Sequence, residues 1–225
     1  MSHCFNEGNR QSIGNLLVIP DADVFVCPDF LEKILVEHER YDDLVVYFRR
    51  YDQSGEDTDP ITLGYLNATC YLEIPTNYGG YITIRKKWML AVNGYEQHPI
   101  FQGNNFTGGK DLYTRLRNIG MAIKLHPSEK PYHPWHPNPK LKRMNREKVA
   151  AQQECIKRRE RSLMVLPYQG LDSRLDSEPD WLPAWLNQWH RTQQRRSIRG
   201  WPLRLVRRLT PNSLKVLFSS NRHKH

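Results

Sequence analysis

Short apolar runs alternate with amphipathic segments along the first 125 residues of the chain. Residues 15–20 (NLLVIP) are an unbroken apolar run, typical of a strand buried on both faces of a mostly parallel sheet. In the next segment, residues 30–39 (FLEKILVEHE), the apolar residues fall on one helical face, and Pro28 or Asp29 suits the first turn. The pattern predicts a strand, then an acidic turn, then a helix.

The same reading continues to residue 125. We expect strands at residues 43–49, 70–74, 80–84 and 121–125, helices at residues 85–92 and 111–119, and a polar loop at residues 49–60. Because strands alternate with helices throughout, the predicted class is α/β. The helix at residues 85–92 should end at Asn93-Gly94, a common helix stop.

The composition changes after Pro139. Residues 145–166 are a charged helix candidate, residues 167–180 read as a link, and residues 195–218 are basic with interleaved apolar residues. We therefore divide the chain into a front domain, residues 1–139, and a basic, mainly helical C-terminal extension, residues 140–225.

Charge and hydropathy agree with this division. The 225-residue chain carries a formal charge of +9, but residues 140–225 hold 20 Lys and Arg against 7 Asp and Glu. The mean hydropathy is −0.71, yet 39% of residues are hydrophobic and 11% aromatic, enough for a core. Basic charge points to polyanionic partners, and it belongs to the extension alone.

Several classes of protein are excluded by the same composition. No apolar run approaches the roughly 18–20 residues that span a bilayer, and the polar N-terminus lacks the apolar segment of a signal peptide. The four cysteines are scattered and contain no CxxC pair, which indicates free thiols in a reducing compartment. We expect a cytoplasmic protein.

An acidic pair follows the first predicted strand. Asp21 and Asp23 stand one residue apart where the strand ends, and ligands of open α/β sheets bind at the carboxyl ends of strands. Two carboxylates there can hold Mg²⁺ or Mn²⁺ and leave positions open for phosphate oxygens. The alternative is a solvated acidic turn that caps the next helix.

Three further segments carry candidate chemistry. His133 and His136 lie in a proline-rich loop and are either metal ligands or solvated side chains around a packed Trp135. Gly79-Gly80 allows close approach of the backbone to a ligand, or forms a tight turn. Asp111 is expected in the first turn of a helix, where it acts in chemistry or as a cap.

The order of these segments is more specific than any one of them. A strand ending in DxD, then GG-strand-helix-NGYE, then a helix with Asp-Leu-Tyr-x-Arg-Leu, then a short strand and YHPWHP resembles the C-terminal half of a GT-A glycosyltransferase domain. Family 2 enzymes and the related galactosyltransferase C-terminal module are the most similar. The resemblance spans residues 5–137 and implies a partial GT-A mixed sheet with flanking helices.

The resemblance implies a metal site and a substrate site. Asp21 and Asp23 match the DxD motif, which binds Mn²⁺ or Mg²⁺ and, through it, the diphosphate of a nucleotide-sugar. His133 or His136 completes the metal site, with His133 preferred, and Trp135 stacks on a sugar face. The residues matching the sugar pocket and the acceptor side are Gly79, Gly80, Tyr81, Asn93, Gly94, Tyr95 and Glu96.

Two departures from the family pattern change what the resemblance implies. Many relatives carry a Glu-Asp pair whose carboxylate is the general base; here Gly108 and Gly109 stand there, and Asp111 is the substitute. Only about 14 residues precede the DxD strand, so the resemblance implies a chain without the nucleotide-binding front half. The chain reads as a family member without that half, which leaves the strand at residues 15–20 exposed.

Two functions follow from this reading. The first is a metal-dependent, inverting transferase of polysaccharide biosynthesis, moving a sugar from a nucleotide-sugar to a hydroxyl of a glycan or lipid-linked acceptor. The second is a truncated, non-catalytic binding protein. The basic extension either packs as an ordinary helix or lies on the anionic inner face of a membrane. Nucleic acid is the less favoured partner, since no nucleic-acid module is visible.

Overall fold

The described part of the chain is a mixed α/β structure. The computed structural model describes residues 2–55, 61–74, 78, 81–101, 107–137 and 146–171. Its helices are α1 (Ser2–Gln11), α2 (Phe30–Arg40), α3 (Leu63–Thr69), α4 (Lys86–Ala91), α5 (Thr107–Asn118) and α6 (Arg146–Ser162), with a 3₁₀ turn, η1 (Pro99–Phe101). Its strands are β1 (Leu16–Pro20), β2 (Leu44–Tyr47), β3 (Arg50–Gln53), β4 (Cys70–Ile74), β5 (Tyr81–Arg85), β6 (Ala122–Leu125) and β7 (Tyr132–His133). The predicted α/β class with a mixed sheet and flanking helices is confirmed.

The first sheet has the strand order β1-β5-β2-β6. β5 is antiparallel to both β1 and β2, whereas β2 and β6 are parallel. The apolar run at β1 suggested a strand of a mostly parallel sheet, and that expectation is wrong. β1 is an antiparallel edge strand, apolar because Leu17 and Ile19 are buried while Leu16 and Val18 pack against the main cluster.

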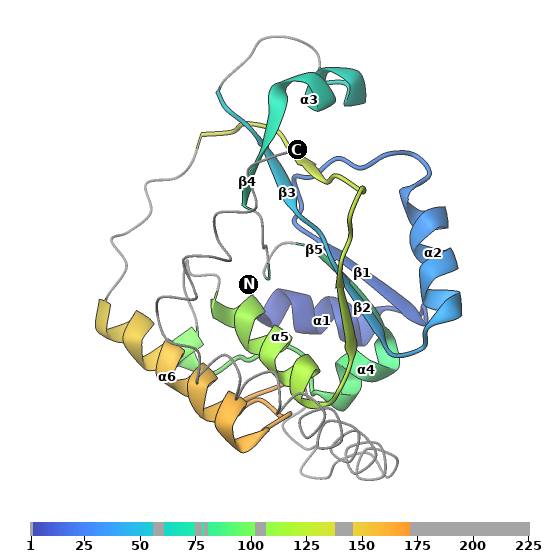
Figure 1. The fold of residues 1–225 in the computed structure, drawn as a ribbon. Helices are drawn as coiled ribbons and strands as arrows, with labels where there is room; N and C mark the ends of the chain where they lie inside the picture. Colours follow the sequence, from blue (N-terminus) through green and yellow to red (C-terminus); the bar gives the residue numbers. More distant parts are fainter. Residues whose placement is uncertain are drawn as a thin grey trace, which may run out of the picture. The chain divides into compact units, whose positions relative to one another are not determined.

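A second, smaller sheet has the order β4-β3-β7. The chain passes from β2 to β3 through only Phe48 and Arg49, so the two sheets follow each other directly (Figure 1). β3 lies inside the segment predicted as a polar loop. Its sequence, RYDQ, has no apolar alternation, and pairing with β4 on one side and β7 on the other defines it as a strand.

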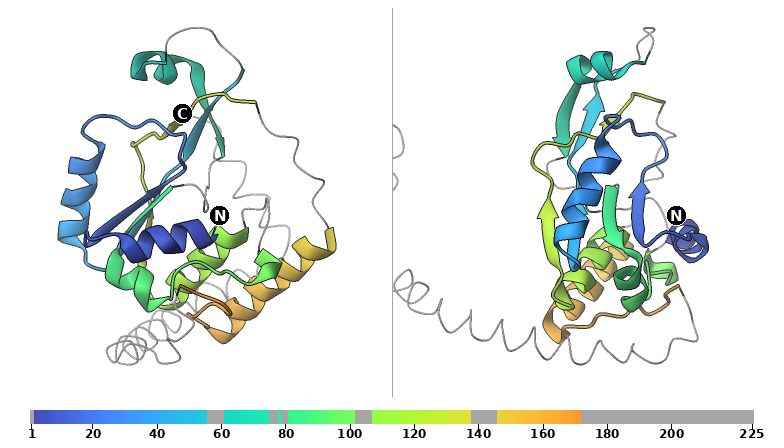
Figure 2. Two further views of the ribbon diagram at one scale, coloured as in Figure 1. Left: turned by 180° about the vertical axis from the view of Figure 1, so that it is seen from behind. Right: turned by 90° about the vertical axis from the view of Figure 1, so that its right-hand side faces the viewer.

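Helix α2 covers one face of the first sheet. Its buried residues Phe30 and Ile34 join Val46, Phe48 and Tyr81 in the main hydrophobic cluster. The rings of Phe30 and Phe48 lie 5.2 Å apart and that of Tyr81 lies 5.1 Å from Phe48. In Figure 2, the right-hand view shows α2 in front of the strands and α1 beyond β1 at the right. This packing places the end of β1, and the acidic turn after it, at the edge of a rigid core.

Helix α1 was not predicted, because its sequence is polar. Its buried residues are Asn6 and Asn9 rather than apolar side chains. The Asn6 amide donates to the backbone oxygen of Tyr95 at 2.9 Å and accepts from the backbone nitrogen of Tyr95 at 2.7 Å. A buried amide that satisfies both backbone groups of one residue fixes α1 against residues 93–96 as a strand pairing would.

Helix α6 packs against α5 and belongs to the front part of the chain. The Asn118 amide, at the end of α5, donates to the backbone oxygens of Arg159 and Met164 at 2.9 and 2.8 Å. By contacts, the chain divides into two compact units at residues 179 and 180. Arg159 is buried although its helix reads as charged, and the division at residue 139 stays a prediction.

The four cysteines are free, as the scattered spacing predicts. No helix among the described residues is both long and apolar enough to cross a bilayer. The expected membrane contact of the basic extension concerns residues that lie mostly outside the described part, and it stays a prediction.

The buried His38 makes the fold sensitive to acid. Its side chain is 1% exposed and its Nε2 lies 2.9 Å from Thr83 Oγ1. Burial, together with the nearby Arg85 guanidinium, lowers the pKa of His38 to about 4. The unfolded histidine titrates near 6.5, so the contribution of neutral His38 is complete above that pH and is lost as the pH falls toward 4.

We expect the free energy of unfolding to fall more steeply between pH 6.5 and 4 in the wild type than in His38→Gln. The difference in slope should approach about 1.4 kcal/mol per pH unit, the effect of one proton. Urea unfolding at several pH values measures it, with the exposed His3→Gln as the control. An acid slope for His38→Gln equal to that of the wild type would contradict this account.

Candidate functional site

Three predicted site residues from two distant parts of the sequence come together in one triangle of ligand atoms. Asp23 Oδ2 lies 3.3 Å from His133 Nε2 and 3.1 Å from His136 Nε2, and the two Nε2 atoms lie 3.3 Å apart. We call this set the Asp–His–His triangle. It unites the DxD turn with both histidines of the YHPWHP loop, between which the sequence left the choice of ligand open.

A short backbone bridge brings the two parts of the triangle together. Phe25, two residues after Asp23, pairs antiparallel with Tyr132, and each backbone nitrogen donates to the other's oxygen at 2.8 Å. Tyr132 begins β7, which runs parallel to β3. His133 therefore faces the turn after β1 because β7 is held between that turn and β3.

The triangle has the size and chemistry of a transition-metal site. A metal about 2.1 Å from each ligand atom places neighbouring ligand atoms about 3 Å apart, close to the observed separations. Two imidazoles and one carboxylate suit Mn²⁺ or Zn²⁺ better than Mg²⁺, which prefers oxygen ligands. The Asp23 and His136 side chains are 47% and 44% exposed, so one side is open to solvent and to ligand oxygens.

Asp21, the first residue of the DxD motif, is not part of the triangle. It is half-buried and lies beside Phe48, Arg49 and Arg50. Burial raises the pKa of Asp21 to about 6, against the opposing charge of Arg50 and with the like charge of Asp23. Burial therefore makes the charged form of Asp21 less favourable than that of an exposed carboxylate.

A second group of potential ligands is already occupied by a lysine. Cys27, Asp29 and Glu129 have ligand atoms near one another. Lys33 Nζ lies 2.9 Å from Asp29 Oδ2 and 2.8 Å from Glu129 Oε1, and so neutralises both carboxylates. The ammonium takes the place that a cation would need.

Of the residues predicted for the sugar pocket, the structure describes only Tyr81. Gly79 and Gly80 lie outside the described residues. Tyr81 is 6% exposed, and its ring packs against Phe30 at 5.4 Å and Phe48 at 5.1 Å. Burial raises the pKa of Tyr81 to about 12. Its ring therefore belongs to the core.

The residues predicted for the acceptor side, Asn93 to Glu96, are all buried. Asn93 and Gly94 end α4 with φ values of 53° and 68°, as the helix-stop prediction requires. A Cβ on Gly94 would lie 2.4 Å from Asn6 Oδ1, so glycine is also needed for the approach of α1. Tyr95 is held by Asn6, and this turn positions neighbouring elements rather than lining open space.

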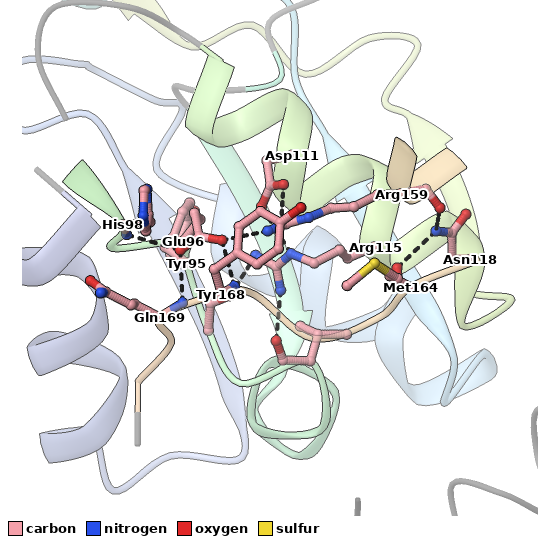
Figure 3. A network of polar contacts seen from close by, with 12 residues as sticks. Tyr95, Glu96, His98, Asp111, Arg115, Asn118, Arg159, Met164, Tyr168 and Gln169 are labelled. Atoms are coloured by element: carbon pink, nitrogen blue, oxygen red, sulfur yellow. Dashed lines mark hydrogen bonds and ion pairs between the residues drawn. The ribbon is translucent and has the colours of Figure 1, made fainter. Parts of the chain in front are cut away.

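Glu96 and Asp111 meet two arginines in a network with no solvent exposure (Figure 3). Arg159 binds Glu96 Oε2 at 2.5 Å and also pairs with Asp111 Oδ1. Arg115 binds Asp111 Oδ2 at 2.9 Å and donates to the backbone oxygens of Val92 and Gly94. We call these four side chains the buried arginine network.

Hydrogen bonds compensate the burial of Glu96. Burial alone would raise the pKa of Glu96, but the Arg159 guanidinium and the backbone nitrogens of His98, Tyr168 and Gln169 outweigh it and lower the pKa. The Arg159 guanidinium also lies 4.5 Å from the centre of the Tyr168 ring. Residues 168–169 are thereby attached to the same carboxylate as α6.

This network gives Asp111 a structural task. The residue was expected in the first turn of its helix, but α5 begins at Thr107, so Asp111 is in the second turn. Both of its oxygens are bound by arginines and its exposed fraction is 0%. In this conformation the carboxylate has no free oxygen for an acceptor hydroxyl, so its predicted role as general base gains no support from the geometry.

Trp135 lies within the loop that carries the triangle's histidines. It is 36% exposed, and its backbone nitrogen donates to Gln53 Oε1 at 3.0 Å. Its indole is thus available at the surface next to His136, as a stacking role requires.

Sequence reasoning did not identify Asp52 and Arg159, two residues that are important in the structure. Asp52 Oδ1 lies 2.9 Å from His133 Nδ1, on the side of the ring away from the triangle. It was overlooked because the segment of β3 was predicted as a polar loop, and a carboxylate in a polar loop does not indicate a functional site. Arg159 looks like one more charge on a charged helix, and only its burial distinguishes it.

Comparisons with known proteins find similarity among solved structures only. No protein-family model matches the sequence, and no curated protein matches it. Among solved structures, the crystal structure of GalNAc-T7 with UDP, GalNAc and Mn²⁺ matches with a TM-score of 0.41 and 12% sequence identity. The match covers 69% of this chain and 36% of that chain, so this chain spans about a third of the neighbour. At this level of likeness, a functional conclusion depends on the side chains of the site itself.

Removing Arg159 should be far more costly than removing its neighbour Arg158. Arg159→Met leaves Glu96 without its ion pair in a buried site, and we expect the free energy of unfolding to fall by about 3–5 kcal/mol. Arg158→Met removes only an ion pair with Glu154 on a side chain that is 69% exposed, and should change stability by less than about 1 kcal/mol. Chemical denaturation measures both variants; equal losses would refute the structural role of the network.

Proposed function

We propose that the chain binds the diphosphate of a nucleotide-sugar through a divalent metal, preferably Mn²⁺, held by Asp23, His133 and His136. The associated reaction is transfer of the sugar to a hydroxyl group of a glycan or lipid-linked acceptor, with inversion. The observation that carries the proposal is the Asp–His–His triangle, with all three separations between 3.1 and 3.3 Å. Its support is the order of sequence segments that resembles GT-A glycosyltransferases.

Each residue of the site has a distinct task in this proposal. When bound, the metal supplies positive charge that stabilises a diphosphate leaving group. Asp23, in the turn after β1, and His133 and His136, on and after β7, would hold that charge. Asp21, the other residue of the DxD motif, stays outside the triangle. Trp135 offers an aromatic face for a sugar ring, and Gly79-Gly80 a backbone that a ligand can approach closely.

A second candidate function is metal-dependent binding of nucleotide-sugars without transfer. It is favoured by one observation: Asp111, the carboxylate expected to deprotonate the acceptor, is fully buried and bound by Arg115 and Arg159. Binding needs only the triangle, whereas transfer also needs a base that reaches the acceptor. The two candidates therefore differ in turnover and agree in metal and nucleotide binding.

Metal binding is the first test. We expect wild-type protein to bind Mn²⁺ at neutral pH, and Asp23→Ala and His136→Ala each to bind it at least tenfold more weakly, because each removes one of three ligands. Electron paramagnetic resonance of free Mn²⁺ measures the affinity. Asp42→Ala is a matched control, since the Asp42 side chain is 59% exposed and that of Asp23 is 47% exposed.

A panel of nucleoside diphosphates then separates the two functions. Mn²⁺-dependent binding of a diphosphate that is lost in Asp23→Ala supports both candidates, and release of the diphosphate from a nucleotide-sugar with an acceptor supports transfer. If Asp23→Ala and Asp42→Ala bind Mn²⁺ as the wild type does, both candidate functions fail.

A further inference from the structure

We propose that Asp52 is the positioning residue of the site: its carboxylate holds His133 as the tautomer protonated at Nδ1 and turns Nε2 toward Asp23 and His136. The proposal rests on the proposed function for its consequence in metal binding, but the tautomer itself is a property of the metal-free protein. No sequence motif contains Asp52, and only the fold brings it to the site.

The contact has the geometry of a carboxylate–histidine hydrogen bond. Asp52 Oδ1 lies 2.9 Å from His133 Nδ1, and the two side chains are 7% and 17% exposed. A carboxylate accepts hydrogen bonds, so Nδ1 must carry the proton in the neutral ring, and the lone pair is left on Nε2. Nε2 is the atom of His133 that lies 3.3 Å from both Asp23 Oδ2 and His136 Nε2.

Asp52 is itself fixed from its other side. Arg50 Nε lies 2.9 Å from Asp52 Oδ1 and donates to Oδ2 at 3.1 Å. In the parallel pairing of β3 with β7, Asp52 is also the partner of His133. The carboxylate is therefore held by its strand and by Arg50, and it can impose an orientation on the imidazole rather than follow it.

The next residue of β3 holds the loop that carries the second histidine. Gln53 Oε1 accepts from the backbone nitrogen of Trp135 at 3.0 Å, and Gln53 Nε2 donates to the Tyr65 hydroxyl at 3.3 Å. Asp52 thus fixes a ligand side chain while Gln53 fixes the backbone between His133 and His136. Asp52 and Gln53, at the end of β3, therefore hold the histidine loop in place from outside the triangle.

A purely structural role for Asp52 makes a different prediction. If the carboxylate served only to pair with Arg50, its loss would lower stability and leave the tautomer of His133 unchanged. If it positions His133, the tautomer changes even where the protein remains folded. The state of the ring nitrogens therefore separates the two roles.

Nitrogen-15 NMR of the metal-free protein at pH 8 reads these nitrogens, with His133→Gln to assign the signals. We expect His133 to be protonated at Nδ1 in the wild type and in Asp52→Asn, whose amide oxygen still accepts. In Asp52→Ala we expect a mixture of tautomers. Arg50→Met keeps the carboxylate and should keep the Nδ1–H tautomer.

Mn²⁺ affinity gives the second readout. We expect Asp52→Ala to bind Mn²⁺ about 10–100-fold more weakly than the wild type, and Asp52→Asn to recover most of that loss. An Nε2–H tautomer in the wild type, or Asp52→Ala with wild-type tautomer and wild-type affinity, would overturn the proposal. Should Asp52→Ala not fold, the wild-type and Asp52→Asn spectra still decide it. Absence of Mn²⁺ binding by the wild type would count against the proposed function, and the tautomer would still decide the role of Asp52.

Discussion

The buried arginine network is the constraint on which the described structure depends. Glu96, Asp111, Arg115 and Arg159 are all without solvent exposure, and their charges are tolerable only because each carboxylate meets a guanidinium. Through them, the turn after α4, the middle of α5, the last turn of α6 and the segment at residues 168–169 share one centre. Removing one charge leaves an uncompensated partner in the core, so these elements form together or not at all.

The triangle depends on a different and more local constraint. The bridge between Phe25 and Tyr132 joins the turn after β1 to β7, and β3 holds β7 from the other side. Ligand atoms that are 110 residues apart in sequence thus stand 3.3 Å apart without help from the arginine network. The buried arginine network and the triangle are therefore separate groups of charged residues. Glu96, predicted for the acceptor side, and Asp111, predicted as the general base, belong to the first group.

Sequence predicted those features that local patterns encode. The apolar run of β1, the amphipathic α2 and the Asn93-Gly94 stop appear where periodicity and helix-ending chemistry require them. Local pattern did not encode α1, whose buried residues are asparagines, or β3, which is a strand only because it has partners on both sides. The antiparallel pairing of β1 was missed for the same reason, since a covered edge strand is as apolar as a central one.

The candidate site, like the fold, could be predicted from the sequence only in part. Asp23, His133 and His136 were identified as candidates by their residue types and order, and the fold brings their ligand atoms together. Asp52 and Arg159 carry no motif, and only the fold brings them into contact with their partners, His133 and Glu96. The most direct test of the central claim is a crystal structure of the chain with Mn²⁺, using the anomalous signal of the metal. We predict a peak about 2.1–2.3 Å from Asp23 Oδ2, His133 Nε2 and His136 Nε2; a map without density for a metal among these atoms would contradict the account.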